Sequence, residues 1–323
     1  MENKSVSIWL FMVNNKEIIE EWFKEMKLFE PTSMMIDRNK KSRKYNEKKF
    51  FVELSEKIKE KFFNINYDGE NNRISVNKNH ENLDAILMTS FIEKKIYKEK
   101  KKEINSLVKK LMVKCGIIAR IVDSTDSFWQ NNTSLRNYET YEKSVKGIPL
   151  KKDLNDPDKY EVDIEKMPGY EENINNIWYG AAWKMWFNTP YYQYVPKDTL
   201  ENYKDCYKNE KLSDECICIT LYEDIDDYDN PKNRELQWKF KKAINFDELV
   251  RKAKENKIKK PVDPEIAFEY GDYKNGAKRR KITYLNDVMD IAHKSKATQA
   301  EIIYYDSNGK FLSQEIKEIE ELE

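Results

Sequence analysis

The chain has 323 residues, of which 39% are hydrophobic, and its 58 basic and 58 acidic side chains give a formal net charge of +0. This hydrophobic content supports a folded core in one large or two smaller domains and argues against a disordered chain. The charge balance disfavours a protein dedicated to nucleic acid, which usually has a basic excess. No apolar run approaches the roughly 20 residues of a membrane span. The four cysteines do not resemble the framework of a small secreted domain. We therefore expect a cytosolic protein in a reducing environment.

Strands and helices alternate along the first 125 residues, which predicts a layered α+β domain. Apolar runs or period-two alternation mark the strands, and apolar residues three and four apart mark the helices. The expected strands span residues 6–13, 33–37, 85–92 and 117–122, with a hairpin over 64–76; the expected helices follow Asn15 and Asn46 and span 93–114.

The middle of the chain is dominated by the aromatic stretch 176–196, which contains Trp178, Trp183 and Trp186. Before it, residues 138–163 are polar and contain glycine and prolines, so we expect a long surface excursion there. Read as a helix, the stretch places Tyr179, Trp183, Trp186 and Phe187 on one face before Pro190 ends it. Large rings dominate core energetics, so we interpret the stretch as a core anchor. A recognition surface stays open as the alternative, because Trp and Tyr are also enriched at interfaces and aromatic density alone does not separate the two. A strand over 215–222 and helices within 234–256 follow.

The C-terminal part begins after residues 257–264, whose sequence KIKKPVDP is the best linker candidate in the chain. Beyond it we expect a strand over 266–270, a helix over 283–294 and a hairpin that turns at Asn308-Gly309. The sequence thus predicts an α+β fold: a main domain over 1–256 with a mixed sheet and helices, and a small helix-plus-hairpin module over 265–323. A subdivision near 123–126 stays open, because the sequence texture changes there.

The candidate chemical motifs do not assemble into a known catalytic or cofactor signature. The acids that follow the 215–222 strand lack the spacing of a calcium loop. Cys216 and Cys218 are too close together for half of a zinc site and are better explained as buried strand residues. The two histidines, His80 and His293, leave little material for a Ser-His-Asp or Cys-His mechanism. We expect no cofactor and no metal, and a catalytic role is disfavoured.

Two basic clusters, Lys94 to Lys102 and Lys278 to Lys281, could contact phosphates. In the first, interspersed glutamates indicate a solvated helix face. The second is denser but holds only four charges. A nucleic-acid partner is therefore disfavoured for both.

A resemblance to a known family emerges from the order of several segments. These are a first strand with Trp9, a helix, the segment SRK at 42–44, the strand GIIARIVD at 116–123 followed by FWQNN, and then WYGAAWKMWF at 178–187. Over residues 5–196 this layout resembles bacterial polymorphic-toxin immunity proteins of the tryptophan-rich α+β type. The excursion over 138–163 and the C-terminal part depart from it. The resemblance implies stoichiometric inhibition of a toxin without catalysis. Codon-biased use of Lys, Asn, Ile and Tyr suits a low-GC bacterium or its phage.

From these observations we expect a protein that presents an aromatic and acidic surface to a protein partner. Acidic groups would suit a basic, nucleic-acid-cleaving toxin through electrostatic steering. The candidate contacts are Trp129, Tyr191, Tyr192, Tyr194, Asp224, Asp226, Asp227 and Asp229. Two alternatives stay open: a phage or mobile-element protein that binds a host defence factor, and a metal-dependent nuclease or phosphoesterase that uses the Asp/Glu clusters.

Overall fold

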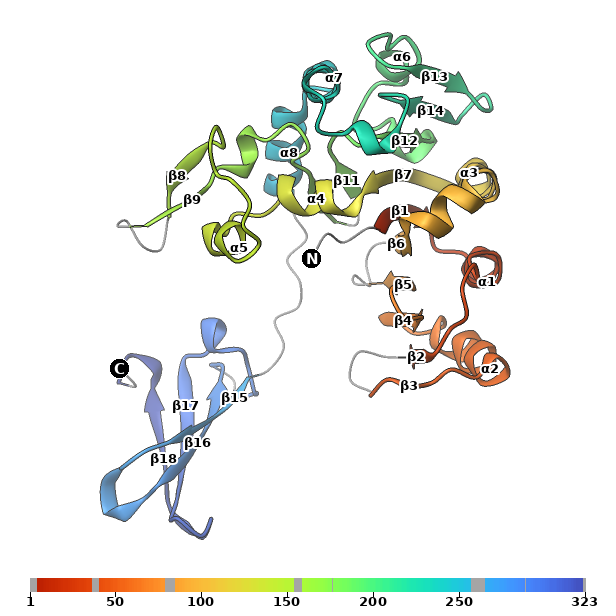
Figure 1. The fold of residues 1–323 in the computed structure, drawn as a ribbon. Helices are drawn as coiled ribbons and strands as arrows, with labels where there is room; N and C mark the ends of the chain where they lie inside the picture. The colour runs from red at the N-terminus through yellow and green to blue at the C-terminus, as the bar shows by residue number, and fades with distance from the viewer. Residues whose placement is uncertain are drawn as a thin grey trace. The chain divides into compact units, whose positions relative to one another are not determined.

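The chain divides into two compact units, Met1–Lys257 and Ile258–Glu323. The computed structural model describes residues 5–36, 41–78, 85–153, 159–175, 177–256, 265–287 and 289–321. The linker predicted for 257–264 lies outside these ranges. Strands and helices are combined in an α+β fold, which confirms the fold class (Figure 1). No helix among the described residues is long and apolar enough to cross a membrane.

A ten-stranded sheet forms the centre of the first unit, in the order β13-β14-β12-β7-β1-β6-β5-β4-β2-β3. Its strands are β1 (Ser5–Val13), β2 (Ser33–Ile36), β3 (Arg43–Lys44), β4 (Phe63–Asp68), β5 (Arg73–Lys78), β6 (Ala85–Glu93), β7 (Gly116–Asp123), β12 (Lys184–Phe187), β13 (Lys208–Lys211) and β14 (Ile217–Thr220). A mixed sheet was expected, but each described pairing is antiparallel. No parallel pair arises at the centre of the sheet, because the chain passes from β6 to the far side of β1 before it forms β7. Those two strands run parallel to each other but both pair with β1 between them.

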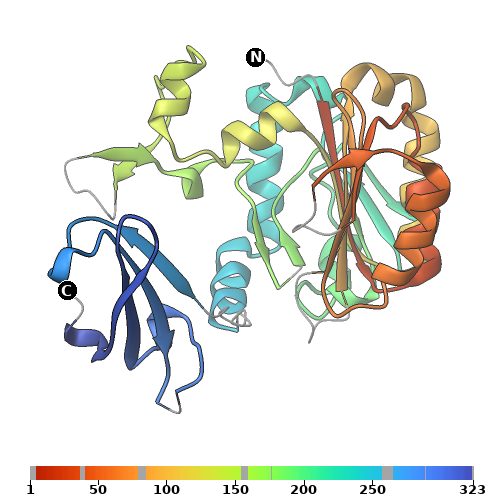
Figure 2. The same ribbon diagram turned by 90° about the horizontal axis from the view of Figure 1, so that it is seen from below.

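Three helices cover one face of this sheet: α1 (Lys16–Glu25), α2 (Glu47–Lys57) and α3 (Lys94–Cys115) (Figures 1 and 2). The side chains of Asn15 and Asn46 accept hydrogen bonds from backbone N–H groups in the first turns of α1 and α2, as expected for N-caps. Alternate residues of β1, among them Ile8 and Leu10, are completely buried. This half of the fold follows the sequence prediction closely.

On the other face of the sheet, α4 and β11 pack against β7, whereas the segment with α5, β8 and β9 extends away from the sheet (Figure 2). The additional elements are α4 (Ser124–Gln130), α5 (Leu135–Thr140), α6 (Lys197–Glu201), α7 (Pro231–Ala243), α8 (Phe246–Glu255), β8 (Leu150–Lys152), β9 (Tyr160–Val162), β10 (Glu172–Ile174) and β11 (Ile177–Tyr179). Short 3-10 helices span Ile164–Lys166, Thr189–Tyr191 and Ile225–Asp227. The change in sequence texture at 123–126 coincides with the end of β7 and the start of α4.

The aromatic stretch contains two separate strands, β11 and β12, so its description as a helix is wrong. After β11, Gly180 to Ala182 turn the chain, and β12 then pairs with β7 on one side and β14 on the other. The interpretation as a core anchor is confirmed, because Trp178, Trp183 and Trp186 are at most 2% exposed. The indole N–H of Trp183 donates to the Tyr222 carbonyl at 2.8 Å. Burial of that ring therefore leaves no polar group unpaired.

The second unit is a four-stranded antiparallel meander of β15 (Ile266–Tyr270), β16 (Arg279–Leu285), β17 (Gln299–Tyr305) and β18 (Phe311–Glu318). Its 3-10 helices span Lys274–Gly276, Lys294–Lys296 and Ile319–Glu321. Its small core contains Ala277, Ile282, Tyr284, Ala300, Ile302 and Tyr304.

The helix predicted over 283–294 is wrong. Residues 283–285 end β16, a turn closed by the hydrogen bond from Asn286 N–H to the Asp290 carbonyl follows, and Ile291 pairs back with Leu285. Long-range pairing with β17 satisfies the backbone here and overrides the helix-like apolar spacing. The turn expected at Asn308-Gly309 is present, and Gly309 has the positive φ of 80° that suits glycine.

Candidate partner-binding surface

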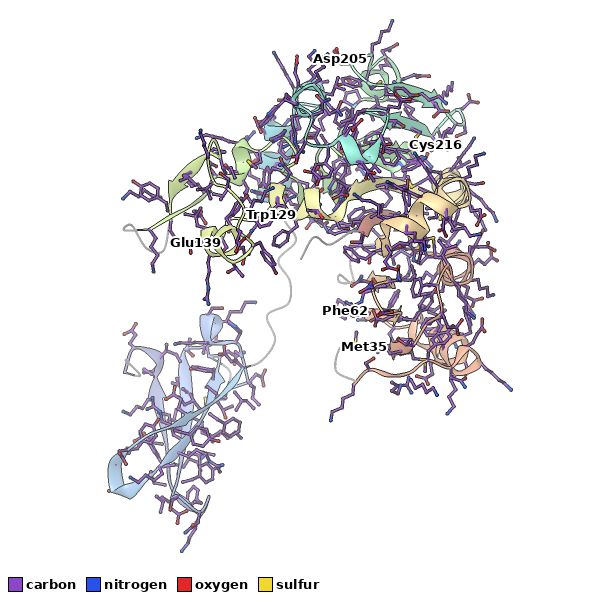
Figure 3. All side chains as sticks on the ribbon, in the orientation of Figure 1. Met35, Phe62, Trp129, Glu139, Asp205 and Cys216 are labelled. Carbon is purple, nitrogen blue, oxygen red and sulfur yellow. The ribbon has the colours of Figure 1, made fainter. Side chains whose placement is uncertain are left out.

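An exposed aromatic cluster lies on α4 and α5 of the first unit. Phe128 and Trp129 come from α4, and α5 and the residue after it bring Tyr138 and Tyr141 against them. The Trp129 ring centroid is 4.6 Å from that of Tyr138 and 4.9 Å from that of Phe128, and the Lys143 ammonium lies 5.2 Å from the Trp129 centroid. We call Phe128, Trp129, Tyr138 and Tyr141 the aromatic cluster. Figure 3 labels Trp129 on α4 and Glu139 on α5.

The members of the aromatic cluster differ in exposure. Tyr138 is buried and donates from its hydroxyl to the Trp129 carbonyl at 3.2 Å. Trp129 is half-buried, whereas Phe128 is 45% and Tyr141 50% exposed. The cluster thus has a fixed base and an accessible edge. Grouped, preorganised rings of this kind are common at the energetic centre of protein interfaces.

A buried ion pair fixes α4 against α7. Asp126 is 2% exposed and accepts two hydrogen bonds from the Arg234 guanidinium, at 3.1 and 2.5 Å. Burial works against the charge on Arg234, but its bonds to Asp126 hold the pKa of the guanidinium above its ordinary value. At the start of the helix, Asp123 accepts from the backbone N–H groups of Thr125 and Asp126. The short helix that carries Phe128 and Trp129 is therefore held rigidly.

Arg234 also connects α4 to the acidic loop, by which we mean residues 224–229. Its guanidinium lies 3.2 Å from an Asp229 carboxylate oxygen. Asp229 of the acidic loop is therefore joined through Arg234 to α4, the helix that also carries Trp129.

The acidic loop is partly neutralised by its neighbours. Asp226 lies 2.8 Å from the Lys94 ammonium and also pairs with Lys98. Partial burial opposes this, but the two ammonium groups hold the pKa of Asp226 below its ordinary value. The Asp224 carboxylate accepts a hydrogen bond from the backbone N–H of Asp226 at 3.0 Å. Within the described ranges, Asp227 is the acid of this loop that has neither an ion pair nor a side-chain hydrogen bond.

A shallow depression of about 520 Å³ borders the acidic loop at the start of α3. It is lined by Glu93, Lys94, Lys95, Lys98 and Glu99. The surface next to the acidic loop is therefore one of alternating charge, which suits polar contacts with a charged protein at the rim of an interface.

The three tyrosines predicted as contacts belong to another part of the unit. Tyr191 is 1% exposed and packs on Phe187 and Tyr194, so its prediction as a surface contact is wrong. Tyr192 is half-buried and donates to the Glu215 carbonyl at 2.7 Å, and Tyr194 packs on Tyr179. These rings close the core beneath β12. In the part of the chain that the structure describes, no contact joins them to the acidic loop.

The other candidate groups have ordinary structural surroundings. Cys216 and Cys218 are at most 2% exposed on β14, and burial raises the pKa of the Cys218 thiol to about 12. His293 lies 3.3 Å from Glu265, and His80 is outside the described residues. Across the described ranges, His, Cys, Asp and Glu side chains do not group in threes as metal ligands do.

Phe128 and Tyr141 were missed in the sequence. Phe128 precedes Trp129 directly, and Tyr138 and Tyr141 are spaced as neighbours on one helical face. That pattern could have linked them, but the surrounding polar residues marked the segment as an excursion.

Known proteins provide little for comparison. The chain matches no protein-family model and no curated protein sequence. Among solved structures it is similar to the Pseudomonas aeruginosa T6SS protein PA0821, with 10% sequence identity and a TM-score of 0.44 over 75% of this chain and 73% of that chain.

Proposed function

We propose that this protein is a non-catalytic interaction protein that binds a protein partner through the aromatic cluster, as a stoichiometric inhibitor does. The observation that carries the proposal is an exposed edge made by Phe128, on the helix fixed by the Asp126–Arg234 pair, and by Tyr141, which packs against Phe128 and Trp129. An anchor that is already ordered loses little conformational entropy on binding, so more of its contact energy contributes to affinity.

The charged residues around the aromatic cluster set the kind of partner. Lys143, whose ammonium lies over the Trp129 ring, and the acids Asp227 and Asp229 of the acidic loop would form polar contacts at the rim. The acidic loop would steer a basic partner, and a toxin that cleaves nucleic acid is of that kind. Because Lys94, Lys98 and Arg234 neutralise part of the loop, we expect steering to be weaker than its four clustered acids would give if none were paired. The inhibitor acts in the cytosol. A phage protein that binds a host defence factor would use the same surface.

The test begins with co-purification of tagged protein from its native host, with metal analysis of the same sample. Affinity for the captured partner is then measured by calorimetry for F128A and for F62A. Phe62 is an equally exposed phenylalanine, 43% against 45%, that directly precedes β4 and lies apart from Trp129 and α4 (Figure 3). Truncation of an interface anchor costs about 2 kcal/mol or more, so F128A should weaken binding about 30-fold while F62A has no effect.

Two outcomes would contradict the proposal. Equal affinities for F128A and F62A would remove the aromatic cluster from the interface. A purified protein that has no partner and holds a divalent metal specifically would favour the alternative of an enzyme that uses Asp and Glu side chains. Replacement of Asp227 and Asp229 by Asn tests the steering separately, because it should lower the association rate and its salt dependence.

A further inference from the structure

The sheet of the C-terminal unit has one face that is covered by its own core and one that is not. Ile282, Tyr284, Ile302 and Tyr304 point into the core. Alternate residues point the other way, and we call them the outer face. The register aligns these residues in three rows across the four strands: Tyr270, Arg279, Tyr305 and Phe311; then Phe268, Lys281, Ile303 and Gln314; then Ile266, Thr283, Glu301 and Ile316.

The aromatic rings of the outer face are unusually exposed for their type. Tyr270 is 76% exposed, Phe268 56% and Phe311 55%. All three lie on the edge strands β15 and β18, where their rings flank the centre of the sheet. Folding of this unit gains little from leaving these rings in water, so their exposure points to a ligand.

The cations of the outer face are also unsatisfied, in contrast to those of the covered face. On the covered face, Arg280 lies 2.6 Å from Glu269, and Lys274 pairs with Glu315. On the outer face, neither Arg279 nor Lys281 has a carboxylate partner among the described residues. The Arg279 guanidinium instead lies over the Tyr305 ring, 4.7 Å from its centroid. Two central cations are thus available to an anionic ligand.

Rings and cations occupy the same two rows of the outer face. The third row, in contrast, holds the aliphatic side chains of Ile266 and Ile316 together with Glu301. An interface for an apolar protein segment would not require this separation. A ligand that alternates flat apolar groups with negative charges does require it, and single-stranded nucleic acid has that chemistry.

We propose that the outer face of the C-terminal sheet binds single-stranded nucleic acid. Bases stack on Phe268, Tyr270 and Phe311, and the backbone phosphates contact Arg279 and Lys281. The outer face also carries Glu301 and Glu318, but these acids lie beyond the two rows that hold Arg279 and Lys281. Their carboxylates accept hydrogen bonds from the side-chain amides of Gln314 and Gln299, and the acids of the covered face are paired there. The surface is distinct from the aromatic cluster of the first unit, and the two proposals stand or fall separately.

The experiment uses the full chain and a fluorescein-labelled oligonucleotide of about 20 thymidines, with fluorescence anisotropy as the readout. R279Q/K281Q should weaken binding at least tenfold. It should also reduce the slope of log affinity against log salt by about 1.4, since each phosphate contact on a single strand contributes about 0.7. Y270A/F311A should weaken binding about fivefold or more for each ring removed. These positions are exposed or half-buried, and circular dichroism verifies that the variants fold.

The matched control is K294Q/K296Q, which removes the same charge from two exposed lysines away from the outer face. This control should bind like the wild type. The proposal is overturned if no oligonucleotide of DNA or RNA binds below about 100 µM, or if the control weakens binding as much as R279Q/K281Q. It is equally overturned if Y270A/F311A abolishes capture of a protein partner while the oligonucleotide is not bound, because the outer face is then a protein interface.

Discussion

Lys241 should make the stability of the first unit depend on pH in a direction opposite to that of most proteins. It lies on α7, is 3% exposed, and donates a hydrogen bond to the Met167 carbonyl at 3.2 Å. Burial lowers the pKa of its ammonium group from 10.5 to about 7, although the carboxylates of Asp247 and Glu171 oppose the shift. The unfolded chain therefore binds a proton more readily than the folded chain between pH 7 and 10.5. Stability should rise with pH across this interval and be lost as pH falls through it.

The magnitude follows from the two pKa values of Lys241. One pKa unit corresponds to about 1.4 kcal/mol, so the free energy of unfolding should increase by about 2 kcal/mol between about pH 6 and 8.5. This is an upper limit, because the faces of three rings attract the charged form. The ammonium nitrogen lies 4.5 Å from the centroid of Phe246, 5.0 Å from Trp238 and 5.2 Å from Tyr170. For a unit of this size the change corresponds to about 4–8 °C in melting temperature.

The assay is thermal unfolding followed by tryptophan fluorescence at a series of pH values. All seven tryptophans lie in the first unit, so the signal is not affected by unfolding of the second. K241M keeps the length of the side chain and removes the titrating group, so its melting temperature should vary less with pH than that of the wild type. If the wild type and K241M change in parallel from about pH 6 to 8.5, Lys241 is charged in the folded protein and the rings outweigh desolvation.

Three further predictions concern other charged or titratable groups of the first unit. Arg120 is fully buried and bonded to Glu171 at 2.5 Å, so R120M should destabilise the unit by about 3–5 kcal/mol in urea unfolding, and R120M/E171Q should recover part of the loss. A double variant no more stable than R120M would show that the cost comes from packing. Burial raises the thiol pKa values of Cys216 and Cys218 to about 11 and 12. These thiols should therefore not react with a disulfide reagent at about pH 8 until the protein unfolds. Fast reaction of either cysteine in the native state, located by mass spectrometry, would contradict this. D226N should cost less than about 1 kcal/mol, because Asp226 and its lysine partners are partly exposed, and a larger loss would identify the loop as a structural element.

The first half of the large sheet could be predicted because local signals and tertiary structure agree there. The run from Val6 to Val13 forms a strand whichever neighbour it pairs with, and Asn15 and Asn46 cap the next helices through contacts within four residues. The order of the ten strands could not be predicted in the same way. It depends on the passage of the chain over β1 between β6 and β7, and no local pattern specifies on which side of β1 the chain returns.

The two helix errors have a common physical cause. At 183–187 and at 283–294, short apolar runs fit both a helical face and a strand buried on both sides. Pairing with β7 and β14 decides the first case. In the second, residues 283–285 pair with β17 and Ile291 forms a bridge back to Leu285. Burial of the tryptophans could be predicted despite this ambiguity, because a ring of that size is buried in either conformation.

Charge clusters in the sequence did not indicate which charges are available to a partner. The acidic loop is the denser cluster. Its Asp226, however, forms ion pairs with Lys94 and Lys98, which lie more than 120 residues earlier in the chain. The basic run from Lys278 to Lys281 is shorter, and strand alternation divides it between two faces. Arg280 meets Glu269 across the covered face, while Arg279 and Lys281 have no acid opposite them on the outer face. A charge is available to a ligand only where the cross-strand neighbour fails to neutralise it. For this reason the shorter basic run, and not the denser acidic loop, gives the better candidate for a surface whose charges are available to a ligand.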